Sequence, residues 1–270
     1  MELKDRVVVI TGASAGIGCA AAQEFARAGS RVVLAARRGE QLDRLAAAIR
    51  AAGGQAWAVP TDVTDREAVC ALIDSTLERW GQIDVLVNNA GCGRIERLEY
   101  QDPQNDIEWQ YRVNVLGVVQ VTRQALPAML ARQQGHIINM CSVAGLIAMP
   151  RYTIYAATKF AVLGFSEALR REVASQGIRV SALCPGAVAD TEFDLHAGVR
   201  RPHRSTTPAW LKVTAAEVGR AVVAVARRPR ACVILPWFYY PVVWLNRLCP
   251  LAVDGILSGA QIVAGQHPRE

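Results

Sequence analysis

The stretch RVVVITGASAGIG, residues 6–18, decides the fold class of this chain. Its first half is a short β-branched run between a charged segment and a glycine, which is typical of a buried parallel strand. An apolar pattern with helical spacing follows over residues 17–28. The junction carries three glycines, Gly12, Gly16 and Gly18. Glycines there allow a tight turn and close approach to the backbone, and the start of a helix attracts phosphate. The strand, glycine turn and helix therefore predict a dinucleotide-binding α/β fold.

The rest of the chain repeats the alternation of strand and helix. Further strands are predicted at residues 31–36, 55–60, 84–88, 136–141, 178–184 and 231–235, with helical patterns between them. Two capping boxes, Thr64 with Glu67 and Thr214 with Glu217, are predicted to open helices. The 270 residues suit one α/β domain, and they contain no internal repeat or linker.

Composition excludes several classes of protein. The chain is 51% hydrophobic and 20% charged, with a net charge of +6. Its arginines are dispersed and no basic run is interleaved with aromatic residues, so we expect no nucleic-acid partner. The seven cysteines have neither CxxC nor zinc-type spacing, which predicts reduced thiols and no metal site. The N-terminus enters a strand at once and leaves no room for a signal peptide, so we expect a cytoplasmic location.

The end of the second predicted strand bears on the choice of cofactor. A carboxylate there would hold the ribose 2′-hydroxyl of NAD. This chain has Arg37 and Arg38 instead, and two guanidinium groups can pair with a 2′-phosphate. NADP(H) is therefore favoured over NAD(H), the alternative being two solvated arginines at a helix start. After the third strand, Asp62 can accept a hydrogen bond from an adenine amino group or cap a turn.

A second group of polar residues points to proton transfer. Ser142 follows the strand predicted at residues 136–141, at the sheet edge where ligands bind in open α/β folds. If Tyr155 opens a helix, Lys159 lies one turn further on the same face. A phenol, an ammonium and a hydroxyl so placed can move a proton to or from a carbonyl oxygen. Asn114, a poor helix former within a helical region, holds backbone or water there, or is simply a satisfied buried amide.

Together these residues resemble the short-chain dehydrogenase/reductase family over about residues 5–235. The motifs that carry the resemblance are Thr11-Gly12-x-x-x-Gly16-x-Gly18, Asn88-Asn89-Ala90-Gly91, Asn114, Ser142, Tyr155-x-x-x-Lys159, and Pro185-Gly186 with Thr191. The resemblance implies a doubly wound, Rossmann-like sheet of about seven parallel strands with helices on both faces. With the strand-end residues above, the expected cofactor positions are Gly12, Ser14, Ala15, Gly16, Ile17, Gly18, Arg37, Arg38, Asp62, Val63, Asn89, Ala90, Gly91, Tyr155, Lys159, Pro185, Gly186, Val188 and Thr191.

The resemblance also implies catalytic roles. Tyr155 would be the general acid/base, and Lys159 would hold the nicotinamide ribose and favour the tyrosinate. Ser142 would hydrogen-bond the substrate carbonyl, and Asn114 would steady a water that relays protons to Lys159. A free tyrosine has a pKa near 10, so a nearby ammonium and an oxidised nicotinamide would bring it toward neutral pH. The implied reaction is hydride transfer between NADP(H) and a carbonyl or secondary alcohol.

Two segments bear on the substrate and partners. The irregular residues 187–212 are predicted to form a substrate loop. Substrate specificity is expected to lie in this loop and in residues 92–98 and 143–151. The apolar residues of these segments favour an apolar substrate, and they include Leu146, Ile147, Met149, Phe193, Leu195 and Trp210. The extension over residues 236–270 is strongly apolar, but prolines and charges interrupt it, so it is unlike a membrane span. It is a pocket wall, a subunit interface or, through residues 236–260, a peripheral membrane contact.

Other functions and assemblies stay open. The extension motivates a second hypothesis, a membrane-associated or nucleotide-sensing binding protein whose catalysis is incidental. Epimerase- or dehydratase-like chemistry is a third. Family members commonly form dimers or tetramers through the helices that carry Asn114 and Tyr155, so the resemblance implies a homodimer or homotetramer.

Overall fold

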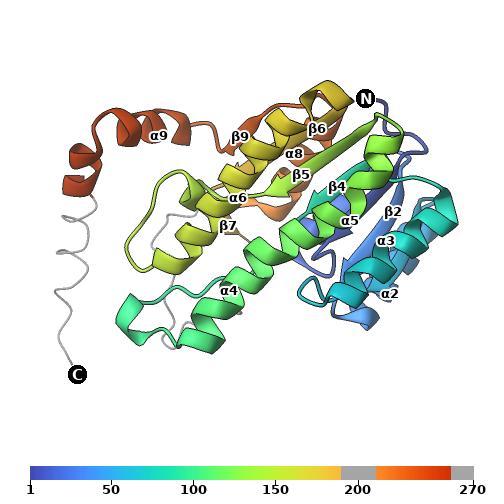
Figure 1. The fold of residues 1–270 in the computed structure, drawn as a ribbon, viewed down its shortest axis with the longest axis horizontal. Helices are drawn as coiled ribbons and strands as arrows, with labels where there is room; N and C mark the ends of the chain where they lie inside the picture. The colour runs from blue at the N-terminus through green and yellow to red at the C-terminus, as the bar shows by residue number, and fades with distance from the viewer. Residues whose placement is uncertain (190–210, 257–270) are drawn as a thin grey trace.

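The computed structural model describes residues 1–189 and 211–256 and contains a seven-stranded parallel sheet (Figure 1). The strands are β1 (Val7–Thr11), β2 (Arg31–Ala36), β3 (Gln55–Pro60), β4 (Val85–Asn88), β5 (Gly135–Met140), β6 (Ile178–Pro185) and β9 (Cys232–Leu235). Their order across the sheet is β3-β2-β1-β4-β5-β6-β9. The predicted doubly wound α/β fold with one domain is confirmed. Strand order reverses between β1 and β4, which in such sheets is the point where ligands bind.

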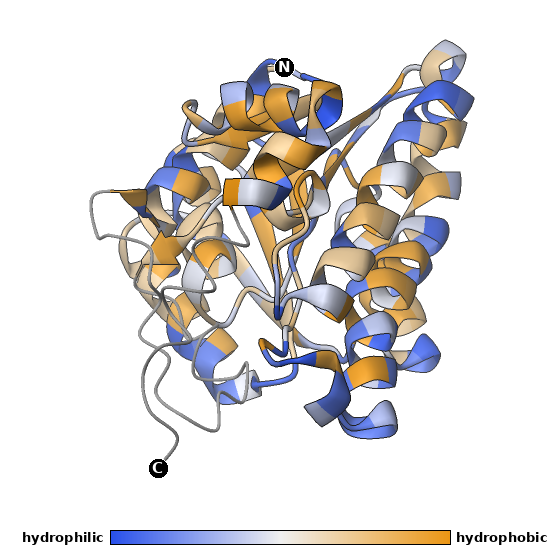
Figure 2. Cartoon of the chain, turned by 90° about the vertical axis from the view of Figure 1, so that its left-hand side faces the viewer, coloured by the Kyte–Doolittle hydropathy of each residue, from blue (hydrophilic) through white to orange (hydrophobic). Residues whose placement is uncertain are grey.

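Helices cover both faces of this sheet. One face carries α1 (Gly16–Arg27), α2 (Gly39–Ala51) and α8 (Ala215–Arg227). The other carries α3 (Arg66–Trp80), α5 (Gly117–Ala131) and α6 (Thr153–Glu172). In Figure 2 helices stand on both sides of the strands, and hydrophobic and hydrophilic residues alternate along them, as amphipathic helices require.

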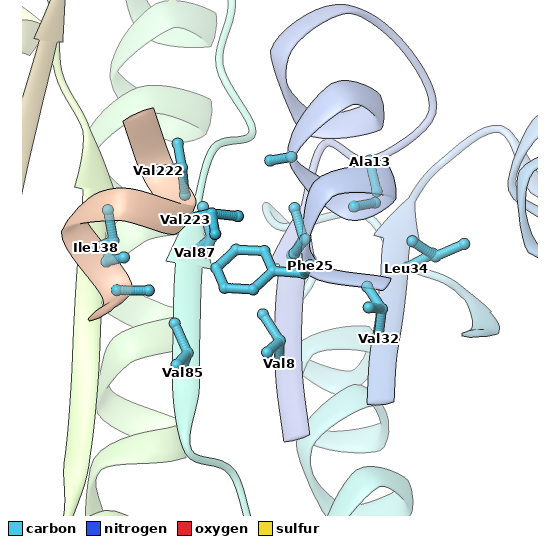
Figure 3. Packing of buried hydrophobic residues seen from close by; sticks show 14 of the residues in the cluster. Val8, Ala13, Phe25, Val32, Leu34, Val85, Val87, Ile138, Val222 and Val223 are labelled. Carbon is cyan, nitrogen blue, oxygen red and sulfur yellow. The ribbon is translucent and has the colours of Figure 1, made fainter. Parts of the chain in front are cut away.

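Successive strand residues feed two separate cores. Val8 packs under α1 and α8, whereas its neighbours Val7 and Val9 face the opposite helical layer. Side chains on a strand point alternately to the two faces, so a strand buried on both sides reads as a continuous apolar run. Phe25 of α1 is fully buried, and Figure 3 shows its ring pointing toward the valines of β4 and α8. Burial of such a ring contributes roughly 1.5–3 kcal/mol.

Two helix starts differ in how well the sequence predicted them. The capping box of Thr214 and Glu217 opens α8 as expected. The box predicted at Thr64 is wrong, because α3 is capped by Asp65, whose carboxylate accepts from the backbone N–H groups of Glu67 and Ala68. Thr64 instead donates its backbone N–H and its hydroxyl to Asp62. A carboxylate at the N-cap satisfies two free helix donors, and the threonine beside it is left to the preceding turn.

The helical region before β5 is not one continuous helix. Short π-helical segments, η2 (Pro103–Glu108) and η3 (Arg112–Leu116), flank α4 (Trp109–Tyr111) ahead of α5. Asn114 lies within η3. Such π-turns are rare and occur often at functional sites. The remaining short elements are η1 (Leu98–Tyr100), η4 (Val143–Gly145), η5 (Ala174–Gln176) and the paired strands β7 (Val188–Ala189) and β8 (Val213–Thr214).

The apolar extension forms helix α9 (Tyr239–Leu248) followed by helical residues 250–256. In Figure 1 it lies at one end of the molecule, beyond the carboxyl end of β9. Val243 and Val253 are buried, 5% and 4% exposed, in a cluster with residues on either side of Ser142. Within residues 1–189 and 211–256, no helix has the length and apolarity needed to cross a membrane.

The opposite, amino-terminal edge of the sheet is held by one buried carboxylate, Asp84. Its side chain is 0% exposed. It accepts hydrogen bonds from the backbone N–H of Val7 at 2.9 Å and the amide of Gln82 at 2.8 Å. Arg6 and Arg132 each approach it to 3.2 Å. Four donors from three segments of the chain thus converge on a single side chain where β1 and β4 begin.

Candidate active site

The predicted glycine turn lies between β1 and α1, at the carboxyl edge of the sheet. Gly12 has a φ of +65°, which only glycine adopts without strain. A Cβ on Gly18 would lie 2.3 Å from the carbonyl oxygen of Gly12, so no other residue fits there. The N-cap of α1 is Ala15, whose methyl group cannot accept a hydrogen bond from the first turn. Ser14 and Ile17 complete this segment, which presents the free N–H groups of a helix start to the switch point.

The asparagine pair after β4 braces the glycine turn. The Asn89 amide donates to the carbonyl oxygens of Thr11 and Gly12, at 3.0 and 3.1 Å. The Thr11 hydroxyl accepts in return from the backbone N–H groups of Asn89 and Ala90. Asn88 is buried and donates to neighbouring side chains on α5 and β5. The pair therefore supports the backbone of the glycine turn and of the strand end.

The residues expected to face the adenosine half follow β2 and β3. Arg38 reaches back to the glycine turn and donates to the Ser14 hydroxyl from Nε at 3.3 Å and Nη2 at 3.1 Å. Arg37 beside it is exposed. Asp62 accepts from Thr64 in a turn, the alternative role considered for it, through Oδ1 alone. Val63 is buried against Gly117 of α5, where a Cβ would lie 2.8 Å from its methyl group.

Asn114 links two parts of the site. Its Oδ1 accepts from the backbone N–H of Cys92, and its Nδ2 donates to the Cys92 carbonyl, both at 2.8 Å. The same Nδ2 donates to the Thr158 hydroxyl at 3.0 Å, which in turn donates to the Tyr155 carbonyl at 2.7 Å. Asn114 therefore ties the chain after Gly91 to the first turn of α6. A Cβ on Gly91 would come within 3.4 Å of Asn114 Oδ1 and 3.5 Å of Lys159 Nζ, so glycine keeps that approach open.

Ser142, Tyr155 and Lys159 come together as the sequence predicts. Ser142 caps η4 at the end of β5, and its hydroxyl is hydrogen-bonded to the Tyr155 phenol. Lys159 Nζ lies 5.6 Å from the centre of the Tyr155 ring and donates to the Met140 carbonyl at 3.1 Å. Both side chains on α6 are buried, Tyr155 at 8% and Lys159 at 5% exposed. The hydroxyl, phenol and ammonium thus occupy one sheltered spot at the carboxyl edge of β5.

Burial dominates the acid–base properties of these groups in the protein alone. It raises the pKa of Tyr155, and the hydrogen bond with Ser142 only partly opposes this. It lowers the pKa of Lys159, because the same apolar surroundings disfavour the ammonium. The lowering of the Tyr155 pKa that is expected from Lys159 and an oxidised nicotinamide together stays a prediction. A phenol with a raised pKa is protonated at neutral pH.

The turn after β6 closes the site on the other side. The Ser142 hydroxyl donates to the Pro185 carbonyl at 3.4 Å, and the Gly186 N–H donates to the Leu235 carbonyl at 2.7 Å. Val188 follows in β7, paired with Val213 of β8. Thr191, and most of the substrate loop predicted at 187–212, lie outside the described residues.

Two residues in this region were missed from the sequence. Thr158 lies inside the Tyr155-x-x-x-Lys159 motif, and its helical spacing from Tyr155 could have indicated a buried hydroxyl facing Asn114. Tyr239, from the extension, packs its ring on Gly186. Nothing in its local sequence distinguishes it from the aromatic residues around it.

The residues at this edge fit a dinucleotide. The glycine turn and the free start of α1 suit a pyrophosphate, while exposed Arg37 and the Arg38–Ser14 pair lie at the end of β2, where an adenosine ribose is bound in such folds. Gly91, Lys159 and Pro185 border the opposite end, next to Ser142 and Tyr155. One end of this edge therefore suits a phosphate group, and the other carries a hydroxyl, a phenol and an ammonium that together can transfer a proton.

Comparison with known proteins agrees with this geometry. Residues 6–198 match the family described as short chain dehydrogenase. An uncharacterized oxidoreductase of Listeria innocua is 40% identical over 192 residues, covering 70% of this chain and 76% of that protein.

Two solved structures extend the likeness. A short-chain dehydrogenase/reductase from Burkholderia phymatum in complex with NAD has a TM-score of 0.82 and 31% identity, covering 100% of this chain and 98% of that one. An alcohol dehydrogenase from Thermococcus sibiricus complexed with 5-hydroxy-NADP has a TM-score of 0.77 and 29% identity, with 86% and 96% covered. With this fold, these motifs and these relatives, the chain belongs to the short-chain dehydrogenase/reductase family of oxidoreductases.

Proposed function

We propose that this protein is an NADP(H)-dependent oxidoreductase that interconverts a carbonyl group and a secondary alcohol on an apolar substrate. The observation that carries the proposal is the convergence of Ser142, Tyr155 and Lys159 at the edge that also bears the glycine turn. Met149, 37% exposed beside this edge, and the buried Leu146 and Ile147 support an apolar substrate.

Each residue has a distinct part in the proposed reaction. When bound, the dinucleotide supplies or accepts the hydride. Tyr155 gives its proton to the carbonyl oxygen as that oxygen gains electron density, or takes it back in the reverse direction. Ser142 donates a hydrogen bond to the same oxygen, and Lys159 offsets the charge left on the phenolate. Asn114 holds Cys92 and Thr158 in place around Lys159, and its part in a water relay stays a prediction.

The most informative experiment is an NADPH-consumption screen over ketones, aldehydes, steroids and 3-oxoacyl thioesters. We expect NADPH-dependent reduction of at least one apolar carbonyl compound. We also expect NADP⁺-dependent oxidation of the alcohol that this reduction produces. Absence of turnover across all four classes in both directions would contradict the proposed activity.

Preference for NADP(H) rests on the basic end of β2. Arg37→Ala should weaken NADPH binding by about 10-fold to 100-fold and NADH binding by less than about twofold, because only NADPH has a 2′-phosphate to pair with guanidinium. Dissociation constants from nicotinamide fluorescence measure both. Arg44→Ala is the matched control. It removes an exposed arginine of α2 that pairs with Glu40, and it should change neither the NADPH nor the NADH dissociation constant. Equal weakening of both cofactors by Arg37→Ala would remove the 2′-phosphate argument.

A second candidate function, membrane association of a cytoplasmic enzyme or nucleotide-binding protein, is favoured by the outer face of the extension. Five large apolar side chains there are more than half exposed: Trp237, Trp244, Leu248, Leu251 and Ile256. Exposed tryptophan and leucine side chains of this kind suit the interface of a lipid bilayer. Their neighbours Val243 and Val253 are buried, so the exposed set can be changed without opening the core.

Liposome flotation tests this candidate. Trp237→Ser, Trp244→Ser, Leu248→Ser and Leu251→Ser combined should reduce binding to phosphatidylcholine vesicles at least about tenfold, since each loses apolar contact worth more than 1 kcal/mol. The matched control is Leu98→Ser with Tyr100→Ser, which removes apolar surface that is 49% and 68% exposed on η1. Equal flotation of wild type and the fourfold variant would contradict membrane association.

A further inference from the structure

The extension takes part in the architecture of the site. Val243 and Val253 pack in one cluster with Cys141 and Val143, the residues on either side of Ser142. The strand end that presents the serine hydroxyl therefore rests on residues 236–256. The family match ends at residue 198, so this support comes from a part of the chain that the family pattern does not cover.

Tyr239, the first residue of α9, packs its ring on Gly186. A Cβ placed on Gly186 would lie 2.5 Å from Cε2 of the Tyr239 ring, 3.0 Å from Cζ and 3.1 Å from the phenolic oxygen. The ring therefore occupies the side of the turn where a residue other than glycine would place its Cβ. Its hydroxyl is also hydrogen-bonded to the backbone of Ala187.

Backbone hydrogen bonds to two other segments hold the turn at residues 185–187. The Gly186 N–H donates to the Leu235 carbonyl at 2.7 Å, and the Ala187 carbonyl accepts from the Val213 N–H at 3.0 Å. Tyr239 adds side-chain contact to this backbone frame. What the turn then presents to the site is the Pro185 carbonyl, which accepts from the Ser142 hydroxyl at 3.4 Å.

We propose that Tyr239 is a positioning residue for the reacting end of the site: by packing on Gly186 it fixes the Pro185 carbonyl and, through it, the Ser142 hydroxyl that faces Tyr155. This inference rests on the proposed oxidoreductase function. Tyr239 places its ring on the turn at Gly186. It acts through the turn, and the substrate-side geometry of the serine depends on it.

The first test compares three tyrosine variants. Tyr239→Ala should lower kcat by about 10-fold to 100-fold, the range in which small displacements of positioned groups fall, with the KM for NADPH changed less than about threefold. Tyr239→Phe keeps the ring on Gly186 and should retain most of the activity. Tyr240→Ala is the matched control, because it removes the adjacent ring, whose hydroxyl accepts from the Ile234 N–H instead, and should leave kcat unchanged.

The second test uses the missing Cβ. Gly186→Ala should lower kcat as Tyr239→Ala does, because the new methyl group displaces the tyrosine ring. In the double variant the methyl group occupies space that the ring has left, so kcat should be no lower than in Tyr239→Ala alone. A merely structural role predicts independent, multiplying losses instead.

Two binding measurements separate this proposal from the proposed function. Binding of 2′,5′-ADP, which carries only the adenosine half, should stay within about twofold of wild type in every variant if the effect is local to the other end. Hydrogen exchange of the amides at residues 186–189 should rise in Tyr239→Ala and not in Tyr240→Ala, whatever the enzyme turns over. Unchanged exchange, or unchanged kcat in both Tyr239→Ala and Gly186→Ala, would overturn the positioning role. Failure of wild type to bind NADPH would overturn the proposed function and leave the exchange result to decide the positioning role.

Discussion

Replacing Tyr155 with phenylalanine is expected to lower kcat for carbonyl reduction by about 10²-fold to 10⁴-fold, the range for loss of a general acid. The substitution removes only the phenolic oxygen, so the buried ring and its contact with Lys159 remain. What disappears is the proton donor, since a phenol is protonated at neutral pH and burial raises the pKa of Tyr155 further. Steady-state NADPH oxidation with the compound found active in the screen measures the loss.

Binding and a neighbouring tyrosine provide the controls. Tyr155→Phe should bind NADPH within about threefold of wild type, because the lost hydroxyl acts on the reacting carbonyl. Tyr152→Phe removes a hydroxyl from a ring whose centre is 6.2 Å from that of Tyr155, and it should change kcat by less than about tenfold. If Tyr155→Phe turned over at a near-normal rate, Tyr155 would not be the acid/base.

Asp84→Ala is expected to lower the free energy of unfolding by roughly 3 kcal/mol. The change leaves the buried Val7 N–H without its acceptor and removes the common partner of Arg6 and Arg132. Those two arginine side chains are 30% and 28% exposed, so water compensates part of their loss, and the unpaired backbone group dominates the effect. Urea unfolding followed by circular dichroism gives the free energy.

An exposed carboxylate calibrates this measurement. Asp43→Ala on the outer side of α2 should change the unfolding free energy by no more than about 0.5 kcal/mol. A similar, small effect for Asp84→Ala would show that the four hydrogen bonds to Asp84 do not anchor the amino-terminal edge. The kcat of the folded Asp84 variant is expected to match wild type.

The sequence predicts the sheet well because its strands have a strong and simple pattern. Residues such as Val8 and Val9 are both buried, and a run of β-branched residues buried on both faces leaves little choice but a parallel strand. The strands predicted at 31–36 and 55–60 match β2 and β3 residue for residue. The glycine turn and the Tyr155–Lys159 pair are equally local, because the geometry follows from spacing along one turn or one helix face.

Features that depend on competition or on distant contacts were harder to predict. Thr64 and Asp65 are both good N-caps, and which of them caps the helix depends on the hydrogen bonds that Asp62 and Asp65 make in the folded chain. The direction of the Tyr155 pKa shift depends on total burial, which no motif encodes. Tyr239 and Gly186 are 53 positions apart in the sequence, and their contact follows from the path of the chain after β9.

Asp84 and Tyr155 lie at opposite edges of one sheet, and this separation bears on how the protein can evolve and be engineered. Four donors converge on one buried carboxylate where the strands begin, whereas the residues of the proposed reaction lie where the strands end. Substitutions of exposed residues at the carboxyl edge, such as Met149, are therefore expected to leave the hydrogen bonds of Asp84 intact. Substrate specificity can therefore change during evolution, because sequence changes at the carboxyl edge do not remove the stabilising hydrogen bonds at the amino-terminal edge.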